Sequence, residues 1–256
     1  MKEYLDNLRK KYETKDFIKD DPIQFPHFFK NDIKNLEVMG FIASIFAFGK
    51  REQFILKLNS ILEFSNYNPY EFILNIEKNE DKLKKFYYRF YKDTDIIALF
   101  YIIKEILAEY ETLGNFFYEK RNNNHKILIQ NVYEKIQNSK YNPKTQGFSF
   151  MISNPARNGA NKRMNMFLRW MVRGGEVDFG IWDFLDKKNL IIPLDIHAGN
   201  VSRELNLLKR KQNDCKSAYE LTQKLKEFDP NDPIGYDFAL FGAGVNKEKL
   251  HVLVSV

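Results

Sequence analysis

The 256-residue chain carries 40 Lys and Arg against 34 Asp and Glu, a formal net charge of +6, and 44% of its residues are hydrophobic. That apolar content is sufficient for a sizeable core. The single cysteine, Cys215, excludes an internal disulfide and any four-cysteine zinc or iron–sulfur site. The four histidines form no Cys/His cluster in the sequence, so we expect no metal site.

Neither the first residues nor the apolar runs predict a membrane segment. Residues 1–13 interleave charged and apolar side chains, which predicts an amphipathic helix without the apolar core of a signal peptide. The longest uncharged apolar run, residues 38–49, has 12 residues, too few to span a bilayer. We therefore expect a cytoplasmic protein with no membrane partner.

Helical periodicity dominates the first half of the chain. Apolar residues recur at spacings of three and four, and the predicted helices cover 33–48, 51–64, 94–107 and 125–138, with a short one beginning at Pro69. Asn31 or Asp32 can cap the first of them, and Asp93 or Thr94 can cap the third. No segment alternates strictly between apolar and polar residues. The pattern therefore predicts an all-α fold.

Residues 138–159 interrupt the helical pattern with two prolines, two glycines and several Asn and Ser residues. Such a segment is typical of a connection or a functional loop. We expect one unit over 1–256 that consists of two helical lobes, approximately 31–140 and 141–256, with the N-terminal helix added to the second. A cleft is expected between the lobes.

The run from Lys135 to Gly175 contains eight Lys and Arg and no Asp or Glu. Removing these eight from the 40 leaves 32 basic residues against 34 acidic ones, so the entire positive excess lies in this run. A local concentration of cations favours a polyanionic partner.

Residues 162–173 within this run predict a helix with two faces. The apolar face consists of Met164, Phe167, Leu168 and Met171. The opposite face consists of Lys162, Met166, Arg169 and Arg173. This second face is either the solvated side of a surface helix or a set of phosphate contacts, to which backbone N–H groups of residues 158–161 can add. A lysine among other cations loses its proton more readily, which would suit Lys162 as a nucleophile.

Residues 194–208 predict a second helix with one buried stripe. The stripe consists of Leu194, Ala198, Val201, Leu205 and Leu208. Asp195 follows Pro193 at the start of this helix, where an N-cap contributes about 1 kcal/mol. A carboxylate that helix amides hold in place also stays ionised and aimed, so capping and catalysis are compatible. His197 is expected in a structural or phosphate-facing role rather than as a metal ligand.

A third segment, residues 232–244, begins with Asp232 as a cap and a proline suited to the first turn of a helix. Asp237 and Phe241 then share one face. A carboxylate followed one turn later by an aromatic ring can bind the edge and the face of a planar base. A core aromatic beside a satisfied aspartate is the alternative.

These segments resemble a known superfamily. Pro193-Leu194-Asp195-Ile196-His197-Ala198-Gly199-Asn200-Val201 is similar to the V-D-x-H-x-x-R-V segment of the helix–hairpin–helix DNA glycosylases, with Leu194 and Asn200 as departures. Gly159-Ala160-Asn161-Lys162 resembles the hairpin that precedes their nucleophilic lysine, although the usual L-P-G-V-G-x-K text is absent. The separation of 33 residues between Lys162 and Asp195 is similar to that of the archaeal 8-oxoguanine DNA glycosylase branch. The 162–173 and 236–242 segments also resemble a bacterial family of unassigned function related to that superfamily.

The resemblance implies a two-lobed helix–hairpin–helix fold and a bifunctional DNA glycosylase/lyase that acts on double-stranded DNA containing an oxidised purine. Lys162 and Asp195 would be catalytic, without a cofactor, in a monomer. Met166, Asp237 and Phe241 would form the base pocket. The implied DNA contacts are Gly159, Arg163, Arg169, Arg173, His197, Asn200 and Arg203, with the Lys209-Arg210-Lys211 triplet as further phosphate contacts.

Two alternatives stay open at this point. A monofunctional glycosylase for alkylated bases would use Asp195 without Lys162. A non-catalytic helical protein that binds nucleic acid would explain the basic run equally well.

Overall fold

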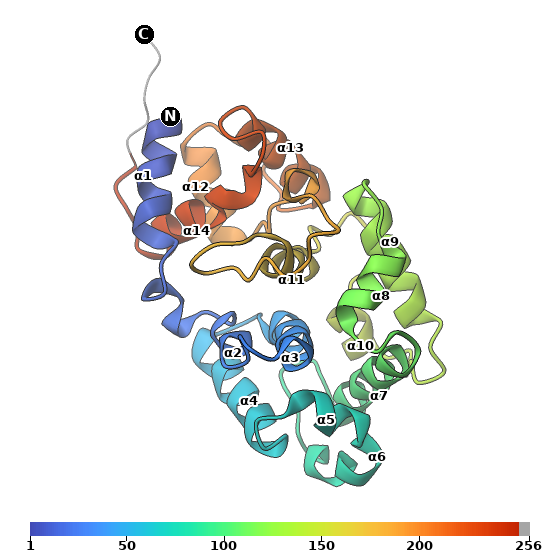
Figure 1. The fold of residues 1–256 in the computed structure, drawn as a ribbon. Coiled ribbons are helices and arrows are strands. Elements are labelled where there is room, and N and C mark those ends of the chain that lie inside the picture. Colours follow the sequence, from blue (N-terminus) through green and yellow to red (C-terminus); the bar gives the residue numbers. More distant parts are fainter. Residues whose placement is uncertain (251–256) are drawn as a thin grey trace. The chain divides into compact units, whose positions relative to one another are not determined.

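The computed structural model describes residues 1–250. Within them the protein is helical, with no β-strand and only three isolated bridges, and this confirms the predicted all-α fold. The chain divides into two compact units: unit 1 comprises residues 1–19 and the chain from Pro155 onward, and unit 2 comprises Asp20–Asn154 (Figure 1). The predicted lobes, 31–140 and 141–256 with the N-terminal helix, therefore have boundaries that differ by 11 and 14 residues.

Unit 2 is built around helix α3. Its helices are α2 (Gln24–His27), α3 (Ile33–Phe46), α4 (Arg51–Phe64), α5 (Pro69–Leu74), α6 (Ile76–Asn79), η2 (Glu80–Leu83), α7 (Asp93–Tyr110), α8 (Leu113–Lys120), α9 (His125–Gln137) and α10 (Gln146–Met151). Every residue of α3 from Asn35 to Phe46 is buried, because α2, α4, α5 and α8 pack around it. The carboxylate of Asp32 accepts a hydrogen bond from the Asn35 amide and caps α3, as expected.

Helix α7 begins at Asp93, but neither Asp93 nor Thr94 is its N-cap. Lys92 occupies that position, and the buried carboxylate of Asp95 accepts a 2.9 Å hydrogen bond from the Lys92 amide. The reciprocal bond of a capping box therefore sets this end of the helix. Helices α8 and α10 were not predicted, because both are short and carry little periodic pattern.

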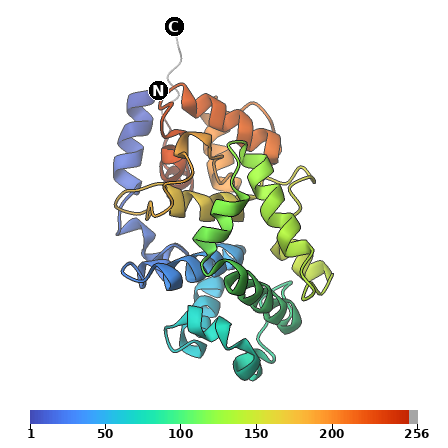
Figure 2. The same ribbon diagram turned by 45° about the vertical axis from the view of Figure 1, so that its right-hand side comes forward.

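Unit 1 combines the two ends of the described chain. Its helices are α1 (Lys2–Tyr12), η1 (Phe17–Asp20), which ends at the unit boundary, α11 (Lys162–Val172), η3 (Lys187–Asn189), α12 (Ile196–Glu204), α13 (Cys215–Lys226), η4 (Pro233–Tyr236) and α14 (Asp237–Val245). Helix α14 packs against both α1 and α12 (Figures 1 and 2). Two glycines of α14 allow this approach, since a Cβ at Gly242 would meet the Tyr12 ring and one at Gly244 would meet His197.

Helix α11 is buried on all sides from Met164 to Val172, so beyond its first turn neither alternative for the second face, a solvated side or a set of phosphate contacts, fits. The chain after α11 folds back over its C-terminal turn. The amides of Phe179 and Trp182 donate 2.9 Å hydrogen bonds to the carbonyls of Trp170 and Met171. This return places Asp178 against Arg169 and Arg173, on the face for which the sequence left solvent or phosphate as alternatives.

Helix α12 is shorter than the predicted 194–208. It ends at Glu204, where Asn206 adopts a positive φ of 58° and the Leu207 amide donates to the Ser202 carbonyl. This closing turn keeps Leu208 buried outside the helix. The apolar stripe therefore continues after the helix has stopped.

No helix within residues 1–250 combines the length and the apolar character that are needed to cross a bilayer.

Candidate active site

Lys162 is the first residue of α11, and the loop before it is fixed from two sides. The side-chain amide of Asn165 donates a 3.0 Å hydrogen bond to the Ala160 carbonyl. On the other side, Gly159 forms an isolated bridge with Asp214, and the Cys215 amide donates to the Asn158 carbonyl at 2.9 Å. The turn into the helix passes through Asn161, which has a left-handed φ of 48°. The position of the Lys162 backbone is therefore set by contacts within unit 1.

Asp195 is the N-cap of α12. Its Oδ1 accepts a 2.8 Å hydrogen bond from the Ala198 amide, so the predicted capping role is confirmed. Its backbone carbonyl accepts from the Asn213 side chain at 3.0 Å. A Cβ at Gly199 would meet the Asn213 amide oxygen at 2.5 Å, and this glycine therefore lets the loop approach the helix. One carboxylate oxygen of Asp195 is held by the helix, while Oδ2 remains available for another partner.

That partner is Lys162. Its Nζ lies 3.2 Å from Asp195 Oδ2, although the two residues are 33 positions apart in the sequence. The lysine side chain is 34% exposed and the aspartate side chain 14%. The pair therefore lies at the surface of unit 1, within reach of a ligand. The nearest charge to Lys162 is a carboxylate, contrary to the expectation of cationic surroundings.

Asp237 adds a second carboxylate to this site. It is the first residue of α14, and its side chain is 11% exposed and ion-paired with Arg169. Burial raises the pKa of Asp237 to about 6, and the Asp195 carboxylate acts in the same direction, whereas Arg169 and Lys162 oppose the increase. Lys162, Asp195 and Asp237 are therefore close enough for their charges to influence one another.

The other predicted base-pocket residues occupy different environments. Met166 is buried on α11, one turn after Lys162. Phe241 is half-buried on α14, and its ring forms an edge-to-face contact with the exposed His197 of α12, with centroids 5.9 Å apart. The contact joins α14, which begins at Asp237, to α12, whose N-cap is Asp195. A stacking role for Phe241 stays a prediction.

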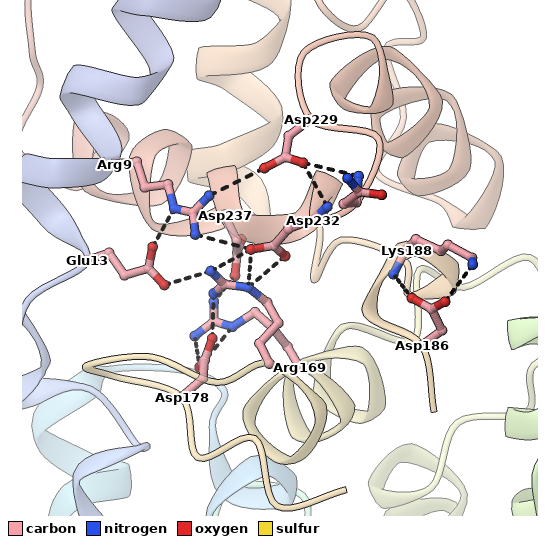
Figure 3. A network of polar contacts seen from close by, with 11 residues as sticks. Arg9, Glu13, Arg169, Asp178, Asp186, Lys188, Asp229, Asp232 and Asp237 are labelled. Carbon is pink, nitrogen blue, oxygen red and sulfur yellow. Dashed lines mark hydrogen bonds and ion pairs between the residues drawn. The ribbon is translucent and has the colours of Figure 1, made fainter. Parts of the chain in front are cut away.

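The interior of unit 1 next to this site contains an ion-pair network (Figure 3). Arg173 pairs with Glu13 at 2.8 Å, with Asp178 at 2.5 Å and with Asp232 at 2.8 Å. Arg9 extends the network from α1 by pairing with Asp232 at 3.1 Å. Burial alone would lower the pKa of the Arg173 guanidinium, but the three carboxylates outweigh it and raise that pKa.

Arg169 connects the network to the candidate active site. Its Nε and Nη2 donate to Asp178 Oδ1 at 3.3 and 3.0 Å, and its Nη1 donates to Asp237 Oδ2. The guanidinium also lies over the Phe238 ring, 4.2 Å from its centroid. Asp178 is therefore shared by Arg169 and Arg173, and of these two arginines Arg169 also pairs with Asp237.

The expected phosphate contacts of Arg169 and Arg173 are wrong. These residues are 2% and 1% exposed, and carboxylates from other parts of unit 1 neutralise them. Asp232 likewise pairs with arginines and makes no capping hydrogen bond to the helix that follows it. Two of the eight cations of the run without acidic residues, Arg169 and Arg173, are thus buried beside acidic residues that are distant in the sequence.

Arg203 is half-exposed, and its guanidinium has partners within unit 1. Its Nε donates to the Arg210 carbonyl at 2.7 Å, and its Nη2 donates to the Gln212 carbonyl and the Asn213 side chain at 3.1 and 2.6 Å. These bonds hold the loop that supports Asp195. Arg210 of the basic triplet pairs with Asp214 at 2.6 Å.

Other predicted DNA contacts remain at the surface of unit 1. The exposed residues of this group are Gly159, His197, Asn200, Lys209 and Lys211, and Arg163 is half-exposed. Their role in DNA binding stays a prediction.

The sequence reasoning missed Asp178 and Asn213. Asp178 follows Gly174-Gly175, a turn signal that could have indicated a return of the chain toward Arg169 and Arg173. No sequence signal would have found Asn213. Within residues 1–250, no group of three or more His, Cys, Asp or Glu side chains is arranged to hold a metal ion.

Comparison with known proteins gives one match. The family model described as "Protein of unknown function (DUF2400)" matches residues 21–246. That range is most of the chain, so the chain belongs to this family. No curated protein and no solved structure matches it.

Proposed function

We propose that this member of the DUF2400 family is a bifunctional DNA glycosylase with associated lyase activity, acting on an oxidised purine such as 8-oxoguanine. The observation that carries the proposal is the Lys162–Asp195 pair: an amine and a carboxylate 3.2 Å apart, each at the start of a helix and partly exposed. A nucleophile with a proton acceptor at hydrogen-bond distance is the arrangement that covalent catalysis requires.

The chemistry begins when the damaged nucleotide leaves the base stack. Lys162 Nζ, after transfer of a proton to Asp195, attacks the sugar C1′, and the N-glycosidic bond breaks with its electrons leaving on the base. Asp195 passes the proton that it accepted from Lys162 to the departing base, and the carboxylate that results stabilises the positive charge that develops on the sugar. The nitrogen bonded to C1′ then carries two protons. One of them goes to the ring oxygen as the C1′–O4′ bond opens, which leaves a protonated Schiff base, and β-elimination from it cleaves the strand.

Asp237 and Phe241 provide the base contacts in this proposal. Asp237 is a buried acceptor that Arg169 holds in position, and Phe241 offers a half-buried ring on the same helix. A carboxylate can accept hydrogen bonds from the N–H groups on the edge of a purine, and an aromatic ring can stack on its face. Met166 lines the same side of α11 as Lys162.

The proposal includes a fold of the helix–hairpin–helix glycosylase type. Residues 158–161 would then take the place of the hairpin, and their ties to Asp214 and Cys215 support a fixed approach to Lys162. Gly159, Arg163, His197 and Asn200 are the proposed contacts to DNA near the site. Arg169, Arg173 and Arg203 are not among them.

Borohydride trapping on a duplex that contains 8-oxoguanine tests the proposal, because only a Schiff base is reduced to a stable protein–DNA adduct. The wild-type protein is expected to form the adduct, and Lys162→Ala and Lys162→Gln are expected to abolish it while duplex binding changes little. Lys187→Ala, which removes an exposed lysine of the same unit that has no assigned role, is the matched control and should trap normally.

Asp195→Asn separates catalysis from capping. Asn is as good an N-cap as Asp, so the variant should fold with nearly normal stability while base release becomes much slower. Near wild-type release by the folded variant would leave capping as the sole role of Asp195.

The same experiment distinguishes the alternatives. Base release that gives strand breaks only after alkali, without an adduct, would point to a monofunctional glycosylase. Equal binding of damaged and intact duplex without base release would point to a non-catalytic nucleic-acid-binding protein.

A further inference from the structure

Unit 2 contains a short segment with an unusual composition, residues 82–92, which we call the aromatic loop. Its sequence, KLKKFYYRFYK, holds five Lys and Arg, five aromatic residues and no Asp or Glu. The segment begins in η2 and leads into α7. None of its residues belongs to the candidate active site.

Two buried tyrosines anchor the aromatic loop. The backbones of Tyr88 and Tyr91 exchange hydrogen bonds at 2.9 and 2.8 Å, which closes a tight turn with Arg89 and Phe90 at its tip. The Tyr91 hydroxyl donates to the Ile45 carbonyl at 3.0 Å, and the Tyr88 hydroxyl donates to the Phe48 carbonyl. The turn is thus fixed to the end of α3, and its tip has a defined position in unit 2.

Two aromatic rings at and beside the tip face solvent. Phe90 at the tip is 59% exposed, and Tyr87, just before the turn, is 65% exposed. The Arg89 guanidinium lies over the rings of Phe48 and Phe90, 5.6 and 5.7 Å from their centroids. Gly49 makes room for it, because a Cβ there would lie 2.8 Å from Arg89 Nη1. The exposed rings and the Arg89 guanidinium therefore form one surface that does not require rearrangement of the turn.

Most of the charge on this surface is not neutralised. All five cations of the aromatic loop are exposed. Within residues 1–250, only Lys84 among them forms an ion pair, with Asp81. Lys57 of α4 adds a further cation, 5.0 Å from the centroid of the Tyr87 ring, and it too makes no ion pair within the described part of the chain. The surface is therefore complementary to an anion.

We propose that the aromatic loop binds single-stranded nucleic acid. Aromatic faces that take unpaired bases, next to cations that take phosphates, are the two elements of sequence-tolerant single-strand binding. Bases would stack on Phe90 and Tyr87, and Arg89 and Lys57 would contact the backbone. A membrane surface fits less well, because the Arg89 guanidinium lies over the Phe48 and Phe90 rings, whereas insertion into a membrane needs an apolar face that is separate from the cations. The proposal does not depend on Lys162.

Fluorescence anisotropy of the full chain with labelled oligothymidylate and oligouridylate tests the proposal. Phe90→Ala is expected to weaken binding roughly five- to a hundred-fold, the factor for one base–aromatic stack, and Phe90→Trp to preserve it. Because Phe90 is exposed, the thermal midpoint should not change. Tyr118→Ala is the matched control, since Tyr118 is also exposed in unit 2 and has Arg121 over its ring at 3.6 Å; it should bind normally.

Lys162→Ala should also bind oligothymidylate normally, which separates this site from the proposed active site. Three results would overturn the proposal. The wild-type protein could bind neither oligonucleotide, or Phe90→Ala and Tyr87→Ala could both bind with wild-type affinity. Alternatively, the loop variants could lose binding to anionic phospholipid vesicles while they still bind the oligonucleotides. The last result would identify the loop as a membrane contact.

Discussion

Arg169 and Arg173 of unit 1 and the cations of the aromatic loop in unit 2 come from sequence runs of the same kind, rich in Lys and Arg and without Asp or Glu. Their environments are opposite. Arg169 and Arg173 are almost fully buried and paired with Asp178, Asp232 and Asp237. The cations of the aromatic loop are exposed, and Arg89 lies over aromatic rings instead of carboxylates.

The difference shows that charge along the sequence does not report charge at the surface. Coulomb interactions depend on distance in space, and folding brings acidic residues from α1, from the return after α11 and from the start of α14 to the arginines of unit 1. Within residues 1–250, the aromatic loop has only the exposed ion pair between Lys84 and Asp81. Arg169 and Arg173 of the longer run thus form internal ion pairs, and the shorter run supplies a cationic surface.

The largest expected effect is on stability. Arg173→Met removes the cation that pairs with Glu13, Asp178 and Asp232 together, and within residues 1–250 it leaves these buried carboxylates only Arg9 and Arg169 as ion-pair partners. An uncompensated buried negative charge should cost about 3–5 kcal/mol of the free energy of unfolding. Both tryptophans, Trp170 and Trp182, belong to unit 1. Urea denaturation followed by tryptophan fluorescence therefore reports on this unit alone.

Arg157→Met is the matched control for that experiment, because Arg157 belongs to the same run and is exposed. It should change the free energy of unfolding by less than about 0.5 kcal/mol. Similar losses for the two variants would contradict the difference between buried and exposed arginines.

An effect of intermediate size concerns pH. The pKa of Asp237 is about 6 in the folded protein against 3.8 for an ordinary aspartate, so the folded state binds this proton more tightly than the unfolded state. The protonated Asp237 therefore stabilises unit 1 fully below about pH 4, and this stabilisation is lost as the pH rises to about 6. The free energy of unfolding should decrease by about 3 kcal/mol over this range. Asp237→Asn should lack this decrease.

The measurement is the free energy of unfolding of unit 1 between these pH values, again by tryptophan fluorescence. The informative quantity is the difference in slope between wild type and variant, because other carboxylates, such as Asp214 with its pKa lowered to about 2 mainly by Arg210, titrate in both proteins. Parallel curves would show that the burial and charges around Asp237 do not shift its proton affinity.

The smallest expected effect is on the salt dependence of binding. Arg89→Gln should reduce the slope of log K against log salt for oligothymidylate by about 0.7, the value for one phosphate contact on a single strand. Arg121→Gln, which alters another arginine over an aromatic ring in unit 2, should leave the slope unchanged. If Arg89→Gln also leaves it unchanged, the exposed cation is not a phosphate contact.

Local sequence signals were sufficient for the all-α class, the starts of α3, α4 and α11, the cap Asp195 and, as one of two candidates with Asn31, the cap Asp32. These features follow from spacings of three and four residues and from side chains that bond amides two or three positions away. Both kinds of signal are local. The buried residues Leu205 and Leu208 were also predicted correctly, although the helix that was to carry them ends at Glu204.

Which charges meet depends on the tertiary fold. Periodicity placed Arg169 on a face that was either solvated or in contact with phosphates, and the return of residues 174–182 places Asp178 against it instead. The 3.2 Å contact of Lys162 with Asp195 and the influence of both on Asp237 join three helix starts from separate parts of the sequence. The energy of a charge depends on its burial and on the partners within a few ångströms, and a linear pattern of residues contains neither quantity.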